Sequence, residues 1–364
     1  MESYSIFMPS YSIGDNDVYK KVPEICAPYG SKAVVIGGRK AMAAAREALE
    51  ASIADSNITI VDYILYGDDV TFEAAEALTR NPVVQNADMI FAVGGGRATD
   101  TCKVAGDKLN KPLFTFPTIC SNCAAVTLVC VMHKPDHSFA GYYFRKAPAV
   151  HAFINLDIIT NAPEKYLWAG IGDSLSKQYE VMFSARGEEL NHTNQIGIDL
   201  SRHAVEPLYK YGTAAMEDVR NHRVSVALQE ITLNVIITCG LISILIDTTR
   251  YNGAVGHAVF YGSTAVDECN ANHLHGEIVA FGTFVQAFID DKPEDQAKIY
   301  QFNTAMGLPT TLAAIGVSYD GPEFEPFMDA VMGDSDLDVT PYPVTREMMI
   351  AGLRAADAYT AAQK

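Results

Sequence analysis

The pattern of apolar and polar positions changes near residue 160, which divides the chain into two kinds of segment. Before that point, short apolar runs typical of buried strands alternate with segments of helical periodicity. The expected strands are residues 33–37, 58–65, 89–93, 113–116, 126–132 and 152–156, and the expected helices are 40–53, 71–81 and 99–109. Repeated alternation of strand and helix predicts a parallel sheet with helices on both of its faces.

After residue 160 the strand-like runs end, and long segments have helical periodicity. These segments are 164–184, 195–211, 216–246, 277–288 and 293–306. The sequence Asn161-Ala162-Pro163 suits a boundary, because proline is tolerated in the first turn of a helix. We therefore predict two domains, an α/β domain over 1–160 and an all-α domain over 161–364.

The composition is that of a folded protein with an acidic surface. The 364 residues are 49% hydrophobic, and 27 Lys and Arg against 44 Asp and Glu leave a net charge of −17. Negative charge repels phosphate backbones and anionic headgroups, so we expect neither nucleic acid nor a membrane surface as a partner. The longest uncharged stretch, 231–246, is shorter than the ~18–20 residues that span a bilayer and is typical of a buried core helix.

The cysteines indicate a reducing compartment. They are odd in number and stand mostly in apolar runs, as Cys26, Cys102, Cys120, Cys123, Cys130, Cys239 and Cys269. The N-terminal sequence has neither the basic region nor the long apolar region of a secretory signal. We therefore expect a cytoplasmic protein.

Two polar turns follow predicted strands of the first domain. Gly94, Gly95 and Gly96 let the backbone turn sharply and a ligand approach closely, and the next helix offers free N–H groups to a pyrophosphate. The spacing is not G-x-G-x-x-G, so an ordinary strand-to-helix turn is the alternative. Thr118 and Ser121 follow the next strand, at the carboxyl end where open parallel sheets bind ligands, and a plain polar turn is the alternative there.

Three residues of the second half have the chemistry of a catalytic metal site. Asp173, His257 and His275 supply one carboxylate and two imidazoles, a three-ligand set for zinc or iron that leaves positions open for substrate. His273 competes with His275 for the third position. Each histidine taken alone is typical of a core or surface residue.

Five segments together resemble the iron-containing alcohol dehydrogenase superfamily, on its glycerol dehydrogenase branch. They are G-G-G-x-x-x-D-x-x-K at 94–103, P-T-I-x-S at 117–121, A-G-I-G-D at 169–173, H-A-V at 257–259 and H-G-E at 275–277. They occur in the family's order and spacing over essentially the whole chain. The resemblance implies a dehydroquinate-synthase-like fold, with an N-terminal Rossmann-like dinucleotide domain, a C-terminal helical domain and the metal in the cleft between them.

The resemblance also implies roles for particular residues. Asp173, His257 and His275 would hold one divalent metal, and through it act in catalysis. The residues implied to bind the dinucleotide are Gly94, Gly95, Gly96, Asp100, Thr118, Ser121, Thr127, Val129 and His133. The metal would act as a Lewis acid during hydride transfer between the nicotinamide and the substrate. Relatives form dimers and larger rings, so a homo-oligomer is expected.

Two positions depart from the glycerol dehydrogenases and bear on the substrate. Cys123 stands where those enzymes place an aspartate against the polyol, and a thiol cannot accept two hydroxyl hydrogen bonds as a carboxylate can. The surrounding residues 117–125 resemble the hydroxycarboxylate dehydrogenase subgroup, which reduces 2-oxo acids. Lys177 lies four residues after Asp173 on the same helix face, and we hypothesise that it holds a substrate carboxylate; the alternative is a solvated or salt-bridged lysine.

Two further departures concern the cofactor and the metal. NAD-preferring members end the first strand with an aspartate that binds the ribose 2′-hydroxyl. Here that position is Gly38, followed by Arg39 and Lys40, so we predict that NADPH is accepted and favoured; two solvated cations are the alternative. Phe260 replaces a second histidine found in many relatives, which leaves three protein ligands and favours zinc over iron.

The function expected from the sequence is hydride transfer between NAD(P)(H) and a small 2-oxo or 2-hydroxy acid. The main alternative is a glycerol or vicinal-diol dehydrogenase that produces dihydroxyacetone. A dehydroquinate-synthase-like lyase is less favoured, because such enzymes bind phosphorylated substrates and residues 251–291 contain no Lys or Arg. The intact glycine and metal segments also disfavour a non-catalytic metal-binding or interaction protein.

Overall fold

The computed structural model describes residues 6–363, which form two compact units. Of these residues, the first unit comprises 6–167 and 214–244, and the second comprises 168–213 and 245–363. Both units are therefore discontinuous in sequence. The boundary predicted at residue 160 places 214–244 in the helical domain. In the structure, the contacts of this segment group it with the first unit.

The first unit is built on a parallel sheet, as the sequence pattern predicts. The order of its six strands is β1-β8-β5-β4-β2-β3, and every neighbouring pair is parallel. The strands are β1 (Tyr11–Gly14), β2 (Lys32–Gly37), β3 (Thr59–Leu65), β4 (Met89–Gly94), β5 (Leu113–Pro117) and β8 (His151–Asn155). The edge strand β1 is missing from the predicted set, because its sequence YSIG is short and only partly apolar.

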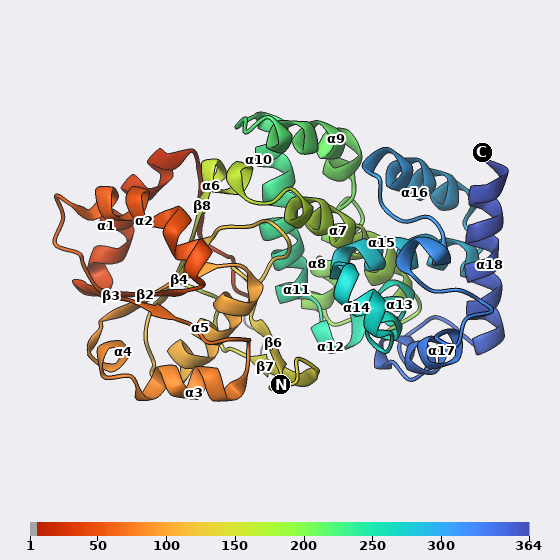
Figure 1. Cartoon of the computed structure of the whole chain (residues 1–364), viewed down its shortest axis with the longest axis horizontal. Helices are drawn as coiled ribbons and strands as arrows, with labels where there is room; N and C mark the ends of the chain where they lie inside the picture. The colour runs from red at the N-terminus through yellow and green to blue at the C-terminus, as the bar shows by residue number, and fades with distance from the viewer. Residues whose placement is uncertain (1–5, 364) are drawn as a thin grey trace. The chain divides into compact units, whose positions relative to one another are not determined.

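Helices cover both faces of this sheet (Figure 1). Successive side chains of a strand point to opposite faces. In β2, Ala33 and Val35 therefore pack with α1 and α2, whereas Val34 and Ile36 pack with α3, α4 and α5. The helices of this part of the chain are η1 (Asn16–Lys21), α1 (Val22–Cys26), η2 (Ala27–Tyr29), α2 (Arg39–Ile53), α3 (Phe72–Arg80), α4 (Pro82–Asn86), α5 (Gly96–Lys108) and α6 (Leu156–Asn161).

An antiparallel hairpin and a long helical run complete the first unit. The hairpin consists of β6 (Val129–His133) and β7 (Phe139–Phe144), so β6 begins later than the predicted strand 126–132. The helical run consists of α10 (Val226–Leu233), a π-helical segment η3 (Asn234–Thr238) and α11 (Cys239–Leu245). Within residues 6–363 this run alone is long and apolar enough to cross a membrane, and 61% of its most apolar window is buried, as in a core helix.

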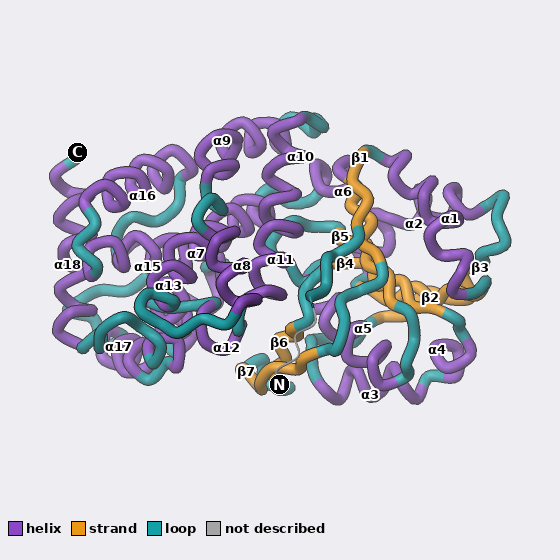
Figure 2. The backbone as a smooth tube through the Cα atoms, turned by 180° about the vertical axis from the view of Figure 1, so that it is seen from behind, coloured by secondary structure: helices purple, strands orange, loops and turns teal. Residues whose placement is uncertain are grey.

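The second unit is helical, and the strands of the described chain all belong to the first (Figure 2). Its core lies around α13 and α15, where Phe281 and Phe284 of α15 and Phe327 of α17 are fully buried. The helices are α7 (Lys165–Ser184), α8 (His192–Ser201), α9 (Glu206–Arg220), α12 (Thr248–Tyr251), α13 (Val255–Thr264), α14 (Asp267–Asn272), α15 (His275–Ile289), α16 (Pro293–Met306), η4 (Leu312–Ile315), α17 (Phe324–Met332), η5 (Ser335–Leu337) and α18 (Arg346–Ala362).

Two long helices predicted from the sequence are each divided in the structure. The predicted segment 195–211 contains the end of α8 and the start of α9. The predicted segment 216–246 is interrupted between α9 and α10, where Ser225 caps α10 by accepting a hydrogen bond from the Leu228 N–H. Capping side chains of this kind compete with helix continuation, and apolar periodicity alone does not register them.

Candidate active site

The glycine triplet lies at the carboxyl end of β4, where the strand order of the sheet reverses. β3 neighbours β2 on one side and β5 neighbours β4 on the other, so the ligand crevice of an open parallel sheet falls between β2 and β4. Both strands end in glycine there. A Cβ atom on Gly37 would lie 2.1 Å from the Val93 carbonyl oxygen, and Gly94 has a φ of +153° that side chains rarely adopt. The close approach places Gly38 beside the triplet.

The loop after β5 packs on the same triplet. The Thr118 N–H donates to the Gly94 carbonyl over 3.4 Å, and a Cβ on Gly96 would lie 2.8 Å from Asn122 Nδ2. Helix α5 begins at Gly96, and its N-cap residue is a glycine that provides no side-chain hydrogen bond. The first N–H groups of α5 therefore remain available to an anionic group. The structure thus brings together the glycines and the Thr118–Asn122 loop, as the sequence predicted.

Asp100 and Thr127, also predicted to bind the cofactor, lie in a buried network. Lys103 Nζ donates to Asp100 Oδ1 (2.9 Å), to Thr127 Oγ1 (3.0 Å) and to the Val129 carbonyl (3.0 Å). The second oxygen of Asp100 accepts the Val131 N–H (3.1 Å). These groups tie α5 to the hairpin strand β6. Their geometry gives them a positioning role, and direct contact with a cofactor stays a prediction.

His133, at the end of β6, belongs to a charged cluster that sequence analysis did not single out. His133 Nδ1 lies 3.1 Å and His137 Nδ1 2.7 Å from Asp69 Oδ2, and Arg97 lies 3.4 Å from Asp69 Oδ1. Burial raises the pKa of Asp69, but the bonds from the two histidines, the Val70 N–H and Arg97 bring it down to about 2. Asp69 therefore connects the start of α5 to the hairpin.

Glycine contacts between helices bring the three predicted metal ligands together. A Cβ on Gly276 would lie 1.9 Å from a backbone oxygen of α7, and one on Gly172 would lie 2.4 Å from the Gly276 oxygen. A Cβ on Gly282 of α15 would lie 2.6 Å from the Gly256 Cα of α13. The three helices touch backbone to backbone. Gly172 of A-G-I-G-D and Gly276 of H-G-E are therefore steric requirements for placing Asp173 beside His275.

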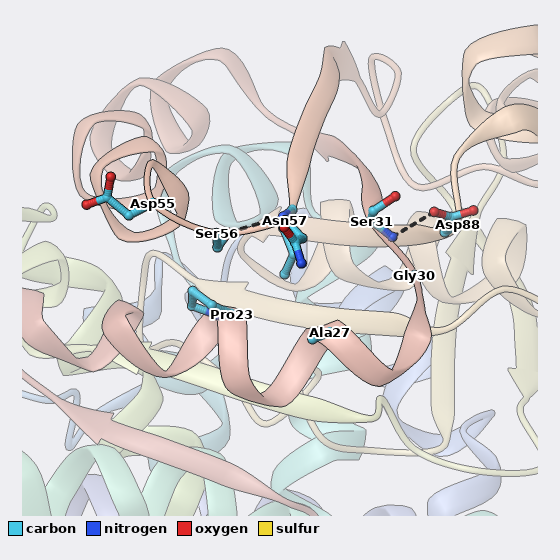
Figure 3. Close-up of a pocket in the computed structure, with 9 residues that line it drawn as sticks. Pro23, Ala27, Gly30, Ser31, Asp55, Ser56, Asn57 and Asp88 are labelled. Atoms are coloured by element: carbon cyan, nitrogen blue, oxygen red, sulfur yellow. Dashed lines mark hydrogen bonds between the residues drawn. The ribbon is translucent and has the colours of Figure 1, made fainter.

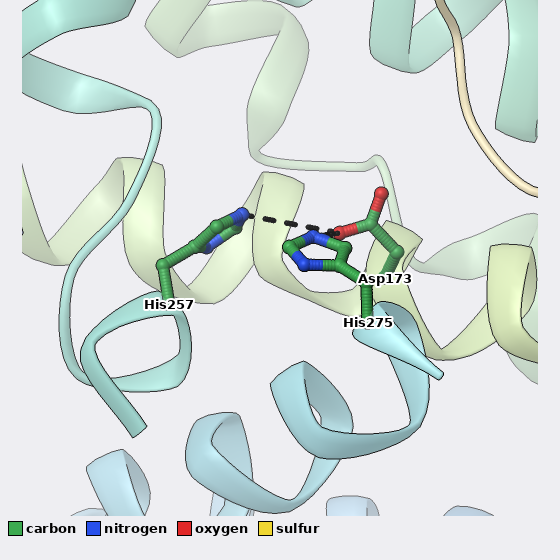
Figure 4. Close-up of side chains that lie close together, drawn as sticks. All are labelled: Asp173, His257 and His275. Atoms are coloured by element: carbon green, nitrogen blue, oxygen red, sulfur yellow. Dashed lines mark ion pairs between the residues drawn. The ribbon is translucent and has the colours of Figure 1, made fainter. Parts of the chain in front are cut away.

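Asp173, His257 and His275 form one cluster, with both imidazoles directed toward the carboxylate (Figure 4). Their ligand atoms all lie within 4.8 Å of one another, and His275 Nε2 is 3.2 Å and His257 Nε2 is 3.9 Å from Asp173 Oδ1. Asp173 Oδ1 is buried and makes no hydrogen bond among the described residues. A bound cation would supply the partner that this buried acceptor lacks. The competitor His273 bonds Glu277 instead, over 2.8 Å. The donor set fits one divalent metal.

The cluster is buried on one side and exposed on the other. The His275 side chain is 41% exposed, against 9% for His257, and the Phe260 ring packs edge-on against His275 with centroids 4.2 Å apart. Burial raises the pKa of Asp173, but His275, Lys177 and His257 together hold it well below its usual range. The carboxylate is therefore ionised and able to ligate at neutral pH.

Glu180, which sequence analysis did not select, is the polar partner of His257. Glu180 Oε2 lies 2.6 Å from His257 Nδ1, and both side chains are buried. Burial lowers the pKa of His257, but the Glu180 carboxylate outweighs it and raises that pKa to about 9. The available signal was spacing: Glu180 lies seven residues after Asp173, on the same face of α7.

Lys177 lies near this cluster and is only 4% exposed, so the solvated-lysine alternative is wrong. Its Nζ donates to Asn252 Oδ1 over 2.8 Å. The Asp336 carboxylate packs on Gly253, where a Cβ would lie 2.2 Å from Oδ2. Burial and the neighbouring Asp336 raise the pKa of Asp334 to about 6. Among the described residues, the carboxylates near the cluster thus outnumber the buried Lys177; they are Asp173, Glu180, Asp334 and Asp336.

The remaining predicted residues lie in the first unit. Cys123 is half-buried beside α11, and a Cβ on Gly240 would lie 3.5 Å from the Cys123 Cβ. Arg39 is exposed at the first position of α2 and makes no ion pair within residues 6–363.

A hollow lies at the other end of the same sheet (Figure 3). Its volume is about 610 Å³, and Ser31, Asn57 and Asp88 line it at the starts of β2, β3 and β4. Asp88 already accepts the N–H groups of Ser31 and Lys32, each over 2.8 Å. Open parallel sheets bind ligands at carboxyl ends, so we do not assign this hollow to the active site.

Comparison with known proteins places the chain in a family. The model of the iron-containing alcohol dehydrogenases matches residues 9–155. A glycerol dehydrogenase of Thermotoga maritima is 31% identical over 81% of both chains. Hydroxycarboxylate dehydrogenase A of Escherichia coli K12 is 29% identical over 79% of this chain and 78% of its own. The crystal structure of a Schizosaccharomyces pombe glycerol dehydrogenase superposes with a TM-score of 0.86 at 23% identity, over 99% of this chain and 92% of that one.

The fold, a Rossmann-like parallel-sheet domain with a helical domain, is that of the glycerol dehydrogenase structure, and the cluster has a donor set that fits a divalent metal. The chain belongs to the iron-containing alcohol dehydrogenase family. It is an oxidoreductase that acts on a small molecule, in a family that uses a nicotinamide cofactor and a divalent metal. The resemblance inferred from five short segments is thereby confirmed.

Proposed function

We propose that the protein transfers hydride between NAD(P)(H) and a small 2-oxo or 2-hydroxy acid, with one divalent metal held by Asp173, His257 and His275. The observation that carries the proposal is the meeting of these three side chains around a buried carboxylate oxygen without a hydrogen bond. We propose zinc rather than iron, because Phe260 fills the position where a further histidine would add a ligand.

When bound, the metal supplies Lewis acidity, which polarises a carbonyl and favours the ionised form of an alcohol. The chain's own groups supply the setting. Asp173, held ionised, offers its Oδ1, and His257 is oriented through its Nδ1 bond to Glu180. The partly exposed His275 leaves the centre accessible to a small substrate. In the first unit, the glycine triplet and the N–H groups at the start of α5 would hold the cofactor's pyrophosphate.

Two residues support an acid as the substrate. Lys177 provides a buried cation near Asp173, and an anion placed beside it would meet opposite charge. Cys123, half-buried, provides no carboxylate to bind a polyol. Glycerol or another vicinal diol is the second candidate. The Thermotoga relative is named for glycerol, and Asp336 offers hydroxyl-accepting oxygens close to the same centre.

We also propose that NADPH is accepted and favoured. Gly38 has no side chain to repel a 2′-phosphate, and the exposed Arg39 beside it makes no ion pair within residues 6–363. A homo-oligomeric state and a cytoplasmic location stay predictions.

The test is reduction of two ketones, hydroxypyruvate and dihydroxyacetone, with NADH or NADPH. Hydroxypyruvate has a carboxylate at the end where dihydroxyacetone has a hydroxymethyl group. We expect turnover of hydroxypyruvate at the higher kcat/KM, loss of activity after chelation and its return with Zn²⁺. D173N provides the control for metal dependence. Turnover of dihydroxyacetone alone would support the diol candidate. If the protein reduced neither of the two ketones nor any simple aldehyde, the proposal would be refuted.

A further inference from the structure

A polar stripe runs along one face of α7, beginning at the metal cluster. We define it as Asp173, Lys177, Glu180 and Ser184, whose spacings of four, three and four residues place all four on one helix face. The last three of them contact one short segment, residues 252–257, which leads into α13 and ends at His257. One helix thus supplies a ligand and grips the segment that carries another.

Two contacts fix the beginning of that segment. Lys177 Nζ donates to Asn252 Oδ1 (2.8 Å), and Ser184 Oγ donates to the Gly253 carbonyl (2.7 Å). The Ser184 side chain is almost fully buried. These bonds hold the backbone of the segment but do not reach the imidazole of His257.

Glu180 makes the contacts that reach His257 itself. Its Oε1 accepts the Ala254 N–H (2.7 Å) and the His257 N–H (3.0 Å), and its Oε2 lies 2.6 Å from His257 Nδ1. The Glu180 side chain is wholly buried. Gly256 is needed here, because a Cβ at that position would lie 3.0 Å from the Glu180 carboxylate. The carboxylate therefore has little room to turn away from the ring.

We propose that Glu180 is the positioning residue of the metal centre: it determines which ring nitrogen of His257 is free to bind the metal. An ionised carboxylate only accepts hydrogen bonds, so His257 Nδ1 must carry the hydrogen. The neutral ring, the form that binds a metal, then has its lone pair on Nε2, the nitrogen directed toward Asp173 Oδ1 at 3.9 Å. This inference rests on the proposed metal role of Asp173, His257 and His275.

The argument predicts that an amide cannot replace the acid. The amide introduced by E180Q could keep its oxygen on the two backbone N–H groups, and its NH₂ would then donate to His257 Nδ1. That contact favours the tautomer with hydrogen on Nε2, and a protonated Nε2 cannot bind the metal. If the amide turned over, its NH₂ would meet two buried N–H donors. Either arrangement costs the centre a ligand or leaves buried donors unpaired.

The experiment compares E180Q with S184A, a matched variant that removes another buried bond between the same stripe and the same segment. Zn²⁺ affinity of the whole chain is measured by competition with a chelating dye, and the visible spectrum of the Co²⁺-loaded protein reports its nitrogen ligands. We expect E180Q to bind Zn²⁺ about 10–100-fold more weakly, with an altered Co²⁺ spectrum. S184A should keep the wild-type spectrum and change the affinity by less than about threefold.

Equal Zn²⁺ affinity of E180Q and wild type would overturn this inference alone, as would equal losses in E180Q and S184A. A wild-type chain that binds no Zn²⁺ would overturn the proposed metal centre together with it. Should E180Q fail to fold, the tautomer can be read in the wild type by nitrogen NMR of the Zn²⁺-loaded protein. Hydrogen on His257 Nδ1 supports the inference, and metal bonded to Nδ1 refutes it.

Discussion

Gly276 offers a direct test of how the helices assemble the metal cluster. In G276A the new Cβ would lie 1.9 Å from a backbone oxygen of α7, whereas an ordinary contact begins at 3.4 Å, so the helices must separate by about 1.5 Å. Backbone oxygens cannot rotate away as flexible side chains do. Overpacking of this kind costs about 1–3 kcal/mol. The adjacent His275 begins α15, so its Nε2 would move away from Asp173 Oδ1.

We therefore expect G276A to lose both stability and metal affinity. Calorimetry of the metal-free protein should show a Tm lowered by several degrees, and competition with a chelating dye should show Zn²⁺ binding at least about tenfold weaker. G106A is the matched control, because its Cβ would meet no atom closer than 3.6 Å and alanine is favoured inside a helix. If G276A binds Zn²⁺ as wild type does, backbone contact between α7 and α15 does not set the ligand geometry.

Three further outcomes follow from the first unit. G38D places a carboxylate where a 2′-phosphate would bind, so the ratio of kcat/KM for NADPH over NADH should fall at least about tenfold; an unchanged ratio would show that Gly38 does not meet the ribose. Asp69 has a pKa of about 2 in the folded protein, below its value in the unfolded chain. Its ionised carboxylate therefore stabilises the folded state by about 1–2 kcal/mol above about pH 4, and this contribution is lost as the pH falls toward 2. Urea unfolding of D69N should then differ from wild type at pH 6 and converge with it near pH 2, and a constant difference would contradict the shift. K103M strands the buried Asp100 carboxylate and should cost about 3–5 kcal/mol, with D100N in the same chain restoring part of it; urea midpoints check both.

The parallel sheet could be predicted because its information is local. Strands such as 89–93 are unbroken apolar runs, and β4 is buried at every position, as a central strand covered on both sides must be. The edge strand β1 was missed for the converse reason. Its four residues are only partly buried, and what makes them a strand is pairing with β8, more than a hundred residues away.

The metal ligands could be selected from sequence, but only through the resemblance of whole segments. Taken alone, His273 and His275 were equivalent choices. The structure separates them, because His273 bonds Glu277 while His275 stands at the start of α15 beside Asp173. Glu180 was missed because nothing in its own neighbourhood marks it. Its function depends on Ala254 and His257, which are distant in sequence.

The sequence by itself determined the class of fold and the glycine turn between β4 and α5. These follow from local apolar patterns and from residue types at fixed short spacings. The tertiary structure alone decided that Lys177 is buried against Asn252, that Asp100 is bound by Lys103, and that Glu180 contacts His257 Nδ1. Each of those depends on burial and on hydrogen bonds between segments far apart in the chain, and such contacts exist only once the helices and strands have packed.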